Sequence, residues 1–158
     1  MKLLITICAR GGSKGIPGKN IKPLNNKPLL HYTLEIAFAF CEKFRADLQI
    51  STDSQEILDC ASLLGYNTEY LRPQKFATDK AGKIDAIRDA WKFAENNFRK
   101  SYDYVLDLDV TSPLRNLQDL ELAFEILVNK PKALNIFSVN KASRNPYFNM
   151  VEESGDGF

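Results

Sequence analysis

The chain has 158 residues, of which 44% are hydrophobic and 26% charged, and its net charge is +1. This composition excludes a disordered chain and a disulfide scaffold, and the near-neutral charge gives no overall attraction to nucleic acid. No apolar run has the length of a membrane span, and the N-terminus leads directly into a strand pattern without room for a signal peptide. We therefore expect a cytoplasmic protein with no membrane or nucleic-acid partner.

Strand and helix patterns alternate along the chain. The apolar run at residues 2–8 predicts a buried strand. Further strands are predicted at residues 46–51, 67–71, 102–108, 133–140 and 148–151. Such alternation predicts one domain over residues 1–158, a three-layer α/β/α sandwich with a mainly parallel sheet. Ligands of such sheets bind at the carboxyl ends of the strands, so the loops that follow the strands are the place to look for a site.

Apolar residues at helical spacing predict the connecting helices. The first begins after Pro28, and its stripe comprises Leu30, Leu34, Ala37, Cys41 and Phe44. The second is expected to start with a capping box formed by Asp53 and Glu56. The third has a stripe of Ile84, Ile87, Trp91, Ala94 and Phe98, which predicts that Trp91 belongs to the core. Asn116 is expected to cap a fourth helix.

Residues 8–28, which read CARGGSKGIPGKNIKPLNNKP, connect the first strand to the first helix. They contain four glycines, no carboxylate and five cations, namely Arg10, Lys14, Lys19, Lys22 and Lys27. Glycine lets a ligand approach the backbone amides, and fixed cations beside such amides bind polyanions. The alternative is a mobile basic surface loop. A strand and a helix fix both ends of the segment, which favours a polyphosphate-binding loop.

Two familiar phosphate motifs do not match this loop. A Walker A sequence requires glycine where Ser13 stands and Ser or Thr where Asn20 stands. The dinucleotide fingerprint GxGxxG requires glycine where Lys14 stands. The density of cations suits a triphosphate better than the pyrophosphate of a dinucleotide.

Four motifs occur in order along the chain: ARGGSKGIPGKNIKPLNNKPLL at 9–30, STDS at 51–54, LRP at 71–73 and TSPLR at 111–115. With them the chain resembles the acylneuraminate cytidylyltransferase family, which includes CMP-sialic, CMP-legionaminic and CMP-pseudaminic acid synthetases. The resemblance implies a Rossmann-like fold of the nucleotide-diphospho-sugar transferase type. It implies an enzyme that joins CTP to a nine-carbon 2-keto sugar acid, giving a CMP-sugar and pyrophosphate with the help of Mg²⁺.

Family members continue beyond the length of this chain. The expectation is therefore that a C-terminal part, with a dimer arm and the rest of the sugar pocket, is missing, and that the full-length protein is a homodimer. The alternatives are a Kdo-type or other sugar nucleotidyltransferase, or a truncated nucleotide-binding module without turnover.

The resemblance also implies roles for individual residues. Arg10, Lys14 and Lys19 would face the triphosphate, with Arg10 and Lys19 as the catalytic cations. Asn20 would help to hold the nucleotide, and Arg72 would lie near the base and phosphates. Three residues would shape the loop, namely Gly11, Gly12 and Ser13.

Some positions depart from the family pattern. Asp109 stands where glutamine is common, and it alternates with Leu108 so that Asp107 and Asp109 project to one side of a strand. Asp109 is predicted to bind Mg²⁺ or a nucleotide hydroxyl, since Mg²⁺ prefers carboxylate oxygens; the alternative is a solvated strand end. Lys80 and Lys83 stand where serines are common, and they either contact the ligand or are ordinary lysines at a helix start.

The remaining candidate residues are Thr111, Arg115, His31 and the three cysteines. Thr111 and Arg115 in TSPLR either touch the ligand or fix their loop, and Thr111 is retained as a candidate ligand contact. His31 has no partner motif and is predicted to be structural. The three cysteines show no metal spacing and are predicted to be buried free thiols, namely Cys8, Cys41 and Cys60.

Overall fold

A computed structural model of the chain describes residues 1–13 and 15–139. The chain divides into two compact units, Met1–Glu121 and Leu122–Phe158. The prediction of a single domain over residues 1–158 stays a prediction. Within the described ranges, no helix combines the length and the apolar character that crossing a membrane requires.

A three-stranded parallel sheet in the order β4-β1-β5 forms the centre of the first unit. The strands are β1 (Leu3–Cys8), β4 (Asp47–Ser51) and β5 (Tyr104–Asp107). The central strand β1 is buried along almost its whole length, because its continuous apolar run can be covered on both faces. The predicted strands at residues 2–8, 46–51 and 102–108 are therefore confirmed.

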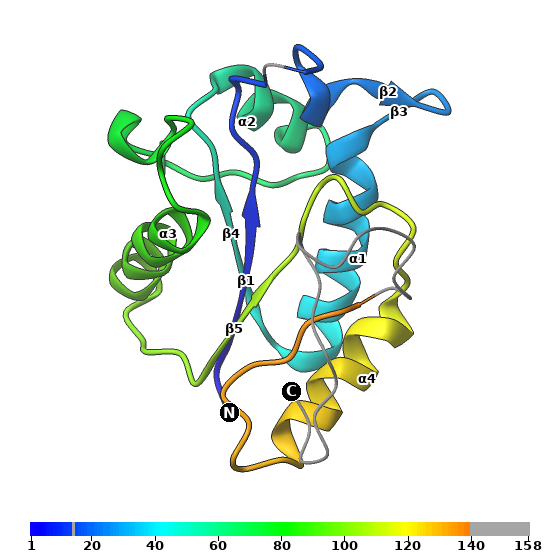
Figure 1. The fold of residues 1–158 in the computed structure, drawn as a ribbon, viewed down its shortest axis with the longest axis vertical. Helices are drawn as coiled ribbons and strands as arrows, with labels where there is room; N and C mark the ends of the chain where they lie inside the picture. Colours follow the sequence, from blue (N-terminus) through cyan, green and yellow to red (C-terminus); the bar gives the residue numbers. More distant parts are fainter. Residues whose placement is uncertain (14, 140–158) are drawn as a thin grey trace, which may run out of the picture. The chain divides into compact units, whose positions relative to one another are not determined.

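Helices α1 (Leu29–Phe44) and α3 (Lys83–Phe98) lie on opposite faces of this sheet, which gives the three layers seen in Figure 1. The shorter α2 (Gln55–Ser62) follows β4. The predicted stripe of α1 is mostly correct, and its buried apolar residues are Leu30, Leu34, Ala37 and Phe40. The α/β class and the parallel sheet are thus confirmed.

The predicted stripe of α3 is correct at Ala94, which is buried, and wrong at its two ends. Ile84 is 65% exposed and Phe98 is 40% exposed, and the helix instead buries three alanines, Ala86, Ala90 and Ala94. Small side chains on that face allow the helix to pack closely on β1 and β4, where isoleucines would hold it away. Trp91 is partly buried and packs against a cluster of Leu4, Ala94 and Tyr102, so its predicted structural role is correct.

Helix α4 (Leu117–Val128) starts with the cap that the sequence predicts. The Asp119 N–H donates to Asn116 Oδ1 at 2.9 Å, and the Asn116 N–H donates to Asp119 Oδ2 at 3.0 Å. Two otherwise unsatisfied amides of the first turn therefore have partners.

The strand predicted at residues 67–71 is not formed. Side chains and one backbone bond cover the edge of β4 instead. The Ile50 N–H donates to the Tyr66 hydroxyl at 2.9 Å, and the Arg72 N–H donates to Thr52 O at 2.7 Å. Residues 133–139 likewise form no strand, and the rest of that prediction, with the strand at 148–151, lies outside the described residues.

A small hairpin that was not predicted lies inside the basic loop. It pairs β2 (Pro23–Leu24) with β3 (Lys27–Pro28). Asn25 and Asn26 connect the strands with φ values of 49° and 62°, a conformation that asparagine tolerates better than most residues. The Asn-Asn pair was the available signal.

The Tyr66 hydroxyl gives a test of the covered edge of β4. Tyr66→Phe leaves the buried Ile50 N–H without its acceptor and is expected to lower the free energy of unfolding by about 1–3 kcal/mol in urea titrations. Tyr32→Phe is the matched control, since its hydroxyl donates to Leu24 O at an exposed position where water can replace it. A loss no larger for Tyr66→Phe than for Tyr32→Phe would contradict this account.

Candidate nucleotide site

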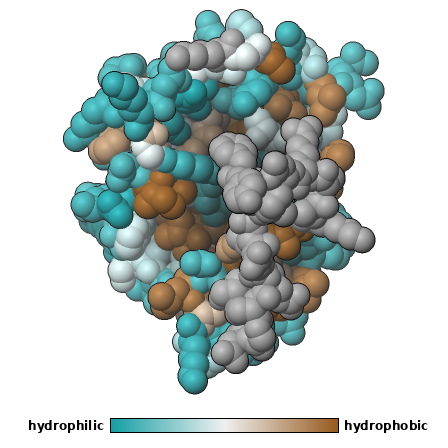
Figure 2. Space-filling model, in the orientation of Figure 1, coloured by the Kyte–Doolittle hydropathy of each residue, from teal (hydrophilic) through white to brown (hydrophobic). Residues whose placement is uncertain are grey.

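A cavity of about 320 Å³ opens beside the carboxyl ends of β1 and β5. Its lining comes from four segments: the loop after β1, residues 72–82, the start of α3 and the loop after β5. Eight residues predicted from the sequence line it, namely Arg10, Ser13, Lys19, Asn20, Arg72, Lys83, Asp109 and Thr111. Figure 2 shows hydrophilic side chains over the upper part of this view of the molecule, where the strands end. Lys14 lies outside the described residues.

The loop after β1 has a tightly packed start. The Gly11 N–H donates to Asp53 Oδ1 at 2.8 Å, and a Cβ on Gly11 would lie 2.9 Å from the Cβ of Ser54. Any other residue at position 11 would therefore collide with the start of α2. Gly12 is different, because a Cβ there would meet open space.

The same contact corrects the predicted capping box at α2. The N-cap residue is Ser54, with no side-chain cap bond, and the Asp53 carboxylate accepts the Gly11 amide instead. The local spacing of Asp53 and Glu56 suggested a helix cap. The parallel register of β1 and β4 instead brings the turns that follow these strands together, so Asp53 bonds to the Gly11 amide of the other turn.

Asn20 closes the loop. It is 7% exposed, and its Nδ2 donates to Arg10 O at 2.9 Å. It lies in η1 (Lys19–Ile21), which begins after Gly18 at a left-handed φ of 64°. Asn20 therefore fixes the position of Arg10 relative to Lys19.

Arg10 has an acidic partner that the sequence did not suggest. Its Nη2 lies 2.9 Å from Asp79 Oδ1, and both side chains are more than one-third exposed. Asp79 belongs to the segment 72–82, in which the sequence singled out Arg72 and Lys80 but not Asp79. Phe76 and Thr78 of that segment also line the cavity.

Arg72 is held rigidly. It is 5% exposed, its Nε donates to Ser51 Oγ at 2.9 Å, and its Nη2 donates to Ser51 O at 2.5 Å. These bonds fix the guanidinium plane at the carboxyl end of β4, on the cavity wall.

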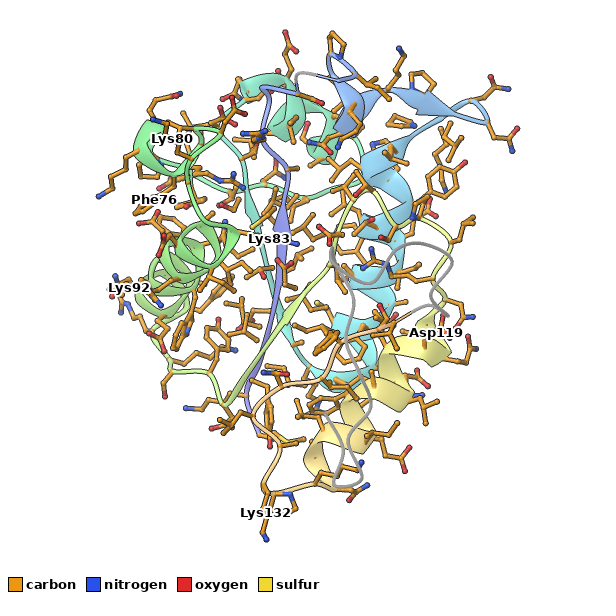
Figure 3. All side chains as sticks on the ribbon, viewed as in Figure 1. Phe76, Lys80, Lys83, Lys92, Asp119 and Lys132 are labelled. Atoms are coloured by element: carbon orange, nitrogen blue, oxygen red, sulfur yellow. The ribbon has the colours of Figure 1, made fainter. Side chains whose placement is uncertain are left out.

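Lys83 joins α3 to the end of β5. Its Nζ lies 2.6 Å from Asp107 Oδ2 and 2.6 Å from Asp109 Oδ1, so the two carboxylates do project to one side as predicted. Burial alone would lower the pKa of Lys83, but hydrogen bonds and charge from the two carboxylates outweigh it and raise that pKa. In Figure 3 Lys83 points toward the strands, whereas Lys80 and Lys92 lie on the outer side.

The donor set can be compared with what Mg²⁺ requires. Among the described residues, no group of three or more His, Cys, Asp or Glu side chains could hold a metal ion. Mg²⁺ in nucleotide sites is usually held by one or two carboxylates, with water and substrate phosphates completing the shell. Asp107 and Asp109, which converge on one point beside the cavity, fit that more limited role.

The loop after β5 is fixed by Arg115. Its Nε donates to Ser112 O at 3.0 Å and its Nη2 donates to Asp109 O. Of the two possibilities left open by the sequence, Arg115 therefore fixes the loop, while the exposed Thr111 lines the cavity.

His31 and the cysteines carry no evident chemistry. The His31 Nε2 donates to Cys60 O at 2.8 Å, because a carbonyl can only accept, and the ring is 8% exposed. All three cysteines are free and partly buried.

Comparisons with known proteins support the family resemblance seen in the sequence. A family model described as cytidylyltransferase matches residues 4–152. The chain is 39% identical over 151 residues to post-translational flagellin modification protein B of Campylobacter coli. It is 38% identical over 151 residues to the CMP-N,N'-diacetyllegionaminic acid synthase of Campylobacter jejuni. Each alignment covers 96% of this chain and 63% of the relative, so the chain spans less than two-thirds of their length.

A solved structure shares the fold. The structure of CMP:2-keto-3-deoxy-manno-octonic acid synthetase complexed with CTP superposes with a TM-score of 0.64 at 21% sequence identity. The match covers 84% of this chain and 49% of that one.

The environment of Cys8, at the cavity wall, gives a test of the site's electrostatics. Burial, with repulsion from Asp107, raises the pKa of its thiol from 9.0 to about 11. At pH 8 the reactive thiolate is then roughly 100-fold scarcer than for an ordinary cysteine, so iodoacetamide should label Cys8 roughly 100-fold more slowly than in urea. Peptide mass spectrometry measures both rates.

A matched pair of variants separates the two causes. Asp107→Asn removes the repulsion and should accelerate labelling of Cys8, whereas Asp103→Asn, at an exposed carboxylate, should not. Equal rates for native and urea-unfolded chain would show that the thiol is not shielded.

Proposed function

Because this chain belongs to the cytidylyltransferase family, we propose that it forms the nucleotide-binding part of an enzyme that activates a nine-carbon 2-keto sugar acid with CTP. The products are a CMP-sugar and pyrophosphate. One observation carries the proposal: eight residues predicted from separate segments of the sequence line one cavity at the carboxyl end of the sheet.

The charges of this cavity suit a triphosphate. Arg10 and Lys19 come from the loop after β1, Arg72 from the segment after α2, and Lys83 from the start of α3. Arginine offers bidentate contacts to phosphate, while lysine acts as a point charge that can follow a moving oxygen. Four cations from three segments can surround a polyanion in a way that one basic loop cannot.

The reaction makes use of these cations. The sugar hydroxyl oxygen attacks the α-phosphorus, the bond from that phosphorus to the bridging oxygen breaks, and pyrophosphate leaves with the electron pair. The hydroxyl proton passes to solvent. Negative charge grows on the departing pyrophosphate, and Arg10 and Lys19 are the residues assigned to stabilise it. A bound Mg²⁺, held by Asp107 and Asp109, would supply further positive charge to the phosphate oxygens.

The printed names of the relatives support a sugar acid as the acceptor. The similarity to the octonic acid synthetase supports the fold alone and does not favour an eight-carbon substrate. A homodimer and a cytoplasmic location remain predictions. A second candidate is a nucleotide-binding module without turnover. The chain spans 63% of the length of these two relatives.

One assay separates these functions. The chain is incubated with CTP, Mg²⁺ and a panel comprising sialic, legionaminic, pseudaminic and eight-carbon keto acids, and pyrophosphate release is followed while mass spectrometry identifies the product. We expect pyrophosphate with a nine-carbon acid. Binding of CTP by calorimetry without pyrophosphate release would establish the module, and no binding of CTP would overturn both functions.

Arg10→Ala tests the triphosphate contact. We expect CTP affinity to fall by roughly ten- to a hundredfold, since a charge-assisted contact to phosphate is worth about 1.5–3 kcal/mol. Arg88→Ala is the matched control, because Arg88 also forms an exposed ion pair with an aspartate but lies outside the cavity lining. Equal affinities for the two variants in calorimetry would remove Arg10 from the site.

Lys19→Ala tests for charge stabilisation during the reaction. Turnover should fall more than CTP affinity, on the order of 2–4 kcal/mol in transition-state stabilisation, because the charge it meets is greatest in the transition state. Steady-state kinetics and calorimetry measure the two quantities. Lys22→Ala, in the same loop but outside the lining, should change neither. A Lys19 variant that weakens binding and turnover equally would contradict this role.

A further inference from the structure

Two carboxylates and one ammonium meet at a single point beside the cavity, which Lys83 and Asp109 line. Lys83 Nζ lies 2.6 Å from each of Asp107 and Asp109, and the Asp107 side chain is 20% exposed. Asp107 is also fixed from behind, since Thr6 Oγ1 donates to its other oxygen at 2.9 Å. The three charges sum to −1, so the point keeps an excess of negative charge with the lysine in place.

This arrangement differs from the ordinary lysine ion pairs of the chain. Lys27 bonds Glu35 and Lys100 bonds Asp47, each at 2.5 Å and away from the cavity. Lys83, by contrast, stands between two carboxylates where the proposed polyanion must enter. Without a cation between them, Asp107 and Asp109 would repel each other and the nucleotide.

A divalent cation fits the same point. Mg²⁺ binds carboxylate oxygens at about 2.0–2.1 Å, and nucleotide sites commonly offer it one or two carboxylates together with phosphates. Asp109 Oδ1 now lies 2.6 Å from the ammonium nitrogen, and it needs only a small movement to reach a metal ion at that distance. The Asp109 side chain is free to make this movement, since it is 57% exposed. The lysine can leave, because its four-carbon stem is flexible and its side chain is 43% exposed. Two cations cannot lie at this point together, so either the lysine ammonium or the metal ion occupies it.

We propose that Lys83 is an exchangeable cation, which holds the point between Asp107 and Asp109 in the ligand-free chain and yields it to the divalent cation that accompanies the nucleotide. Its ammonium then turns to the phosphates of the nucleotide that is bound in the same cavity. This inference rests on the proposed function for the identity of the nucleotide. Its signature is that Lys83 competes with metal, so removing the lysine strengthens metal binding.

The test is Mn²⁺ binding without nucleotide, followed by the electron paramagnetic resonance signal of free Mn²⁺. Lys83→Met keeps the length of the side chain and removes its charge, and it should bind Mn²⁺ about tenfold or more tightly than the parent chain. Adding Asp109→Asn to that variant should abolish the gain. Lys92→Met, on the outer side of the same helix, is the control and should bind like the parent. Lys83→Met binding no tighter than the parent, or a gain that survives Asp109→Asn, would overturn the proposal.

A second measurement leaves the chain unmutated, in case the freed carboxylates destabilise the variant. The ¹⁵N resonance of the Lys83 ammonium, assigned with Lys83→Arg, should shift when Mg²⁺ is added to the CTP-bound chain. An unchanged resonance on addition of Mg²⁺ would overturn the exchange. A chain that gains Mn²⁺ on Lys83→Met yet binds no CTP would instead refute the proposed function and leave the two-carboxylate point intact.

Discussion

Parallel pairing of β1 with β4 on one side and β5 on the other is the constraint on which the site depends. The register sets Cys8 opposite Ser51 and Thr6 opposite Asp107. All three strands therefore end at one edge, and the loops that follow them must meet there. The glycine loop, the arginine fixed on Ser51 and the carboxylates at the end of β5 are far apart in sequence. They meet because the helices return the chain to the same end of the sheet.

The cavity formed in this way is already compensated in charge. Arg10 is paired with Asp79, and Lys83 with Asp107 and Asp109. Under the proposed function, ligand binding exchanges partners, and phosphate oxygens replace these carboxylates. The free energy gained is then the difference between two ion pairs, which favours a ligand of high charge density over a neutral one. The family match and the relatives confirm the resemblance to the cytidylyltransferases, and the ligand proposed above, a nucleoside triphosphate, has such a charge density.

The sequence predicted the features that local residue patterns determine. It did not predict the features that depend on tertiary packing. A continuous apolar run identified β1, shorter strand patterns identified β4 and β5, and the Asn116 cap needed only residues of its own helix turn. The burial of Ala86 and Ala90 in α3 could not be predicted from hydrophobicity, because close approach to the sheet selects small side chains over large apolar ones. Asp53 was taken for a helix cap because its partner, Gly11, lies in another loop. Asp79 gave no signal for the same reason.

The central claim is that this cavity receives the triphosphate of CTP. A crystal structure of the chain grown with CTP and Mg²⁺ tests it most directly. The account predicts phosphate density within hydrogen-bonding distance of Arg10 and Lys19, with the Arg10–Asp79 ion pair opened. Nucleotide density elsewhere on the chain, with this cavity unfilled and that ion pair intact, would contradict it.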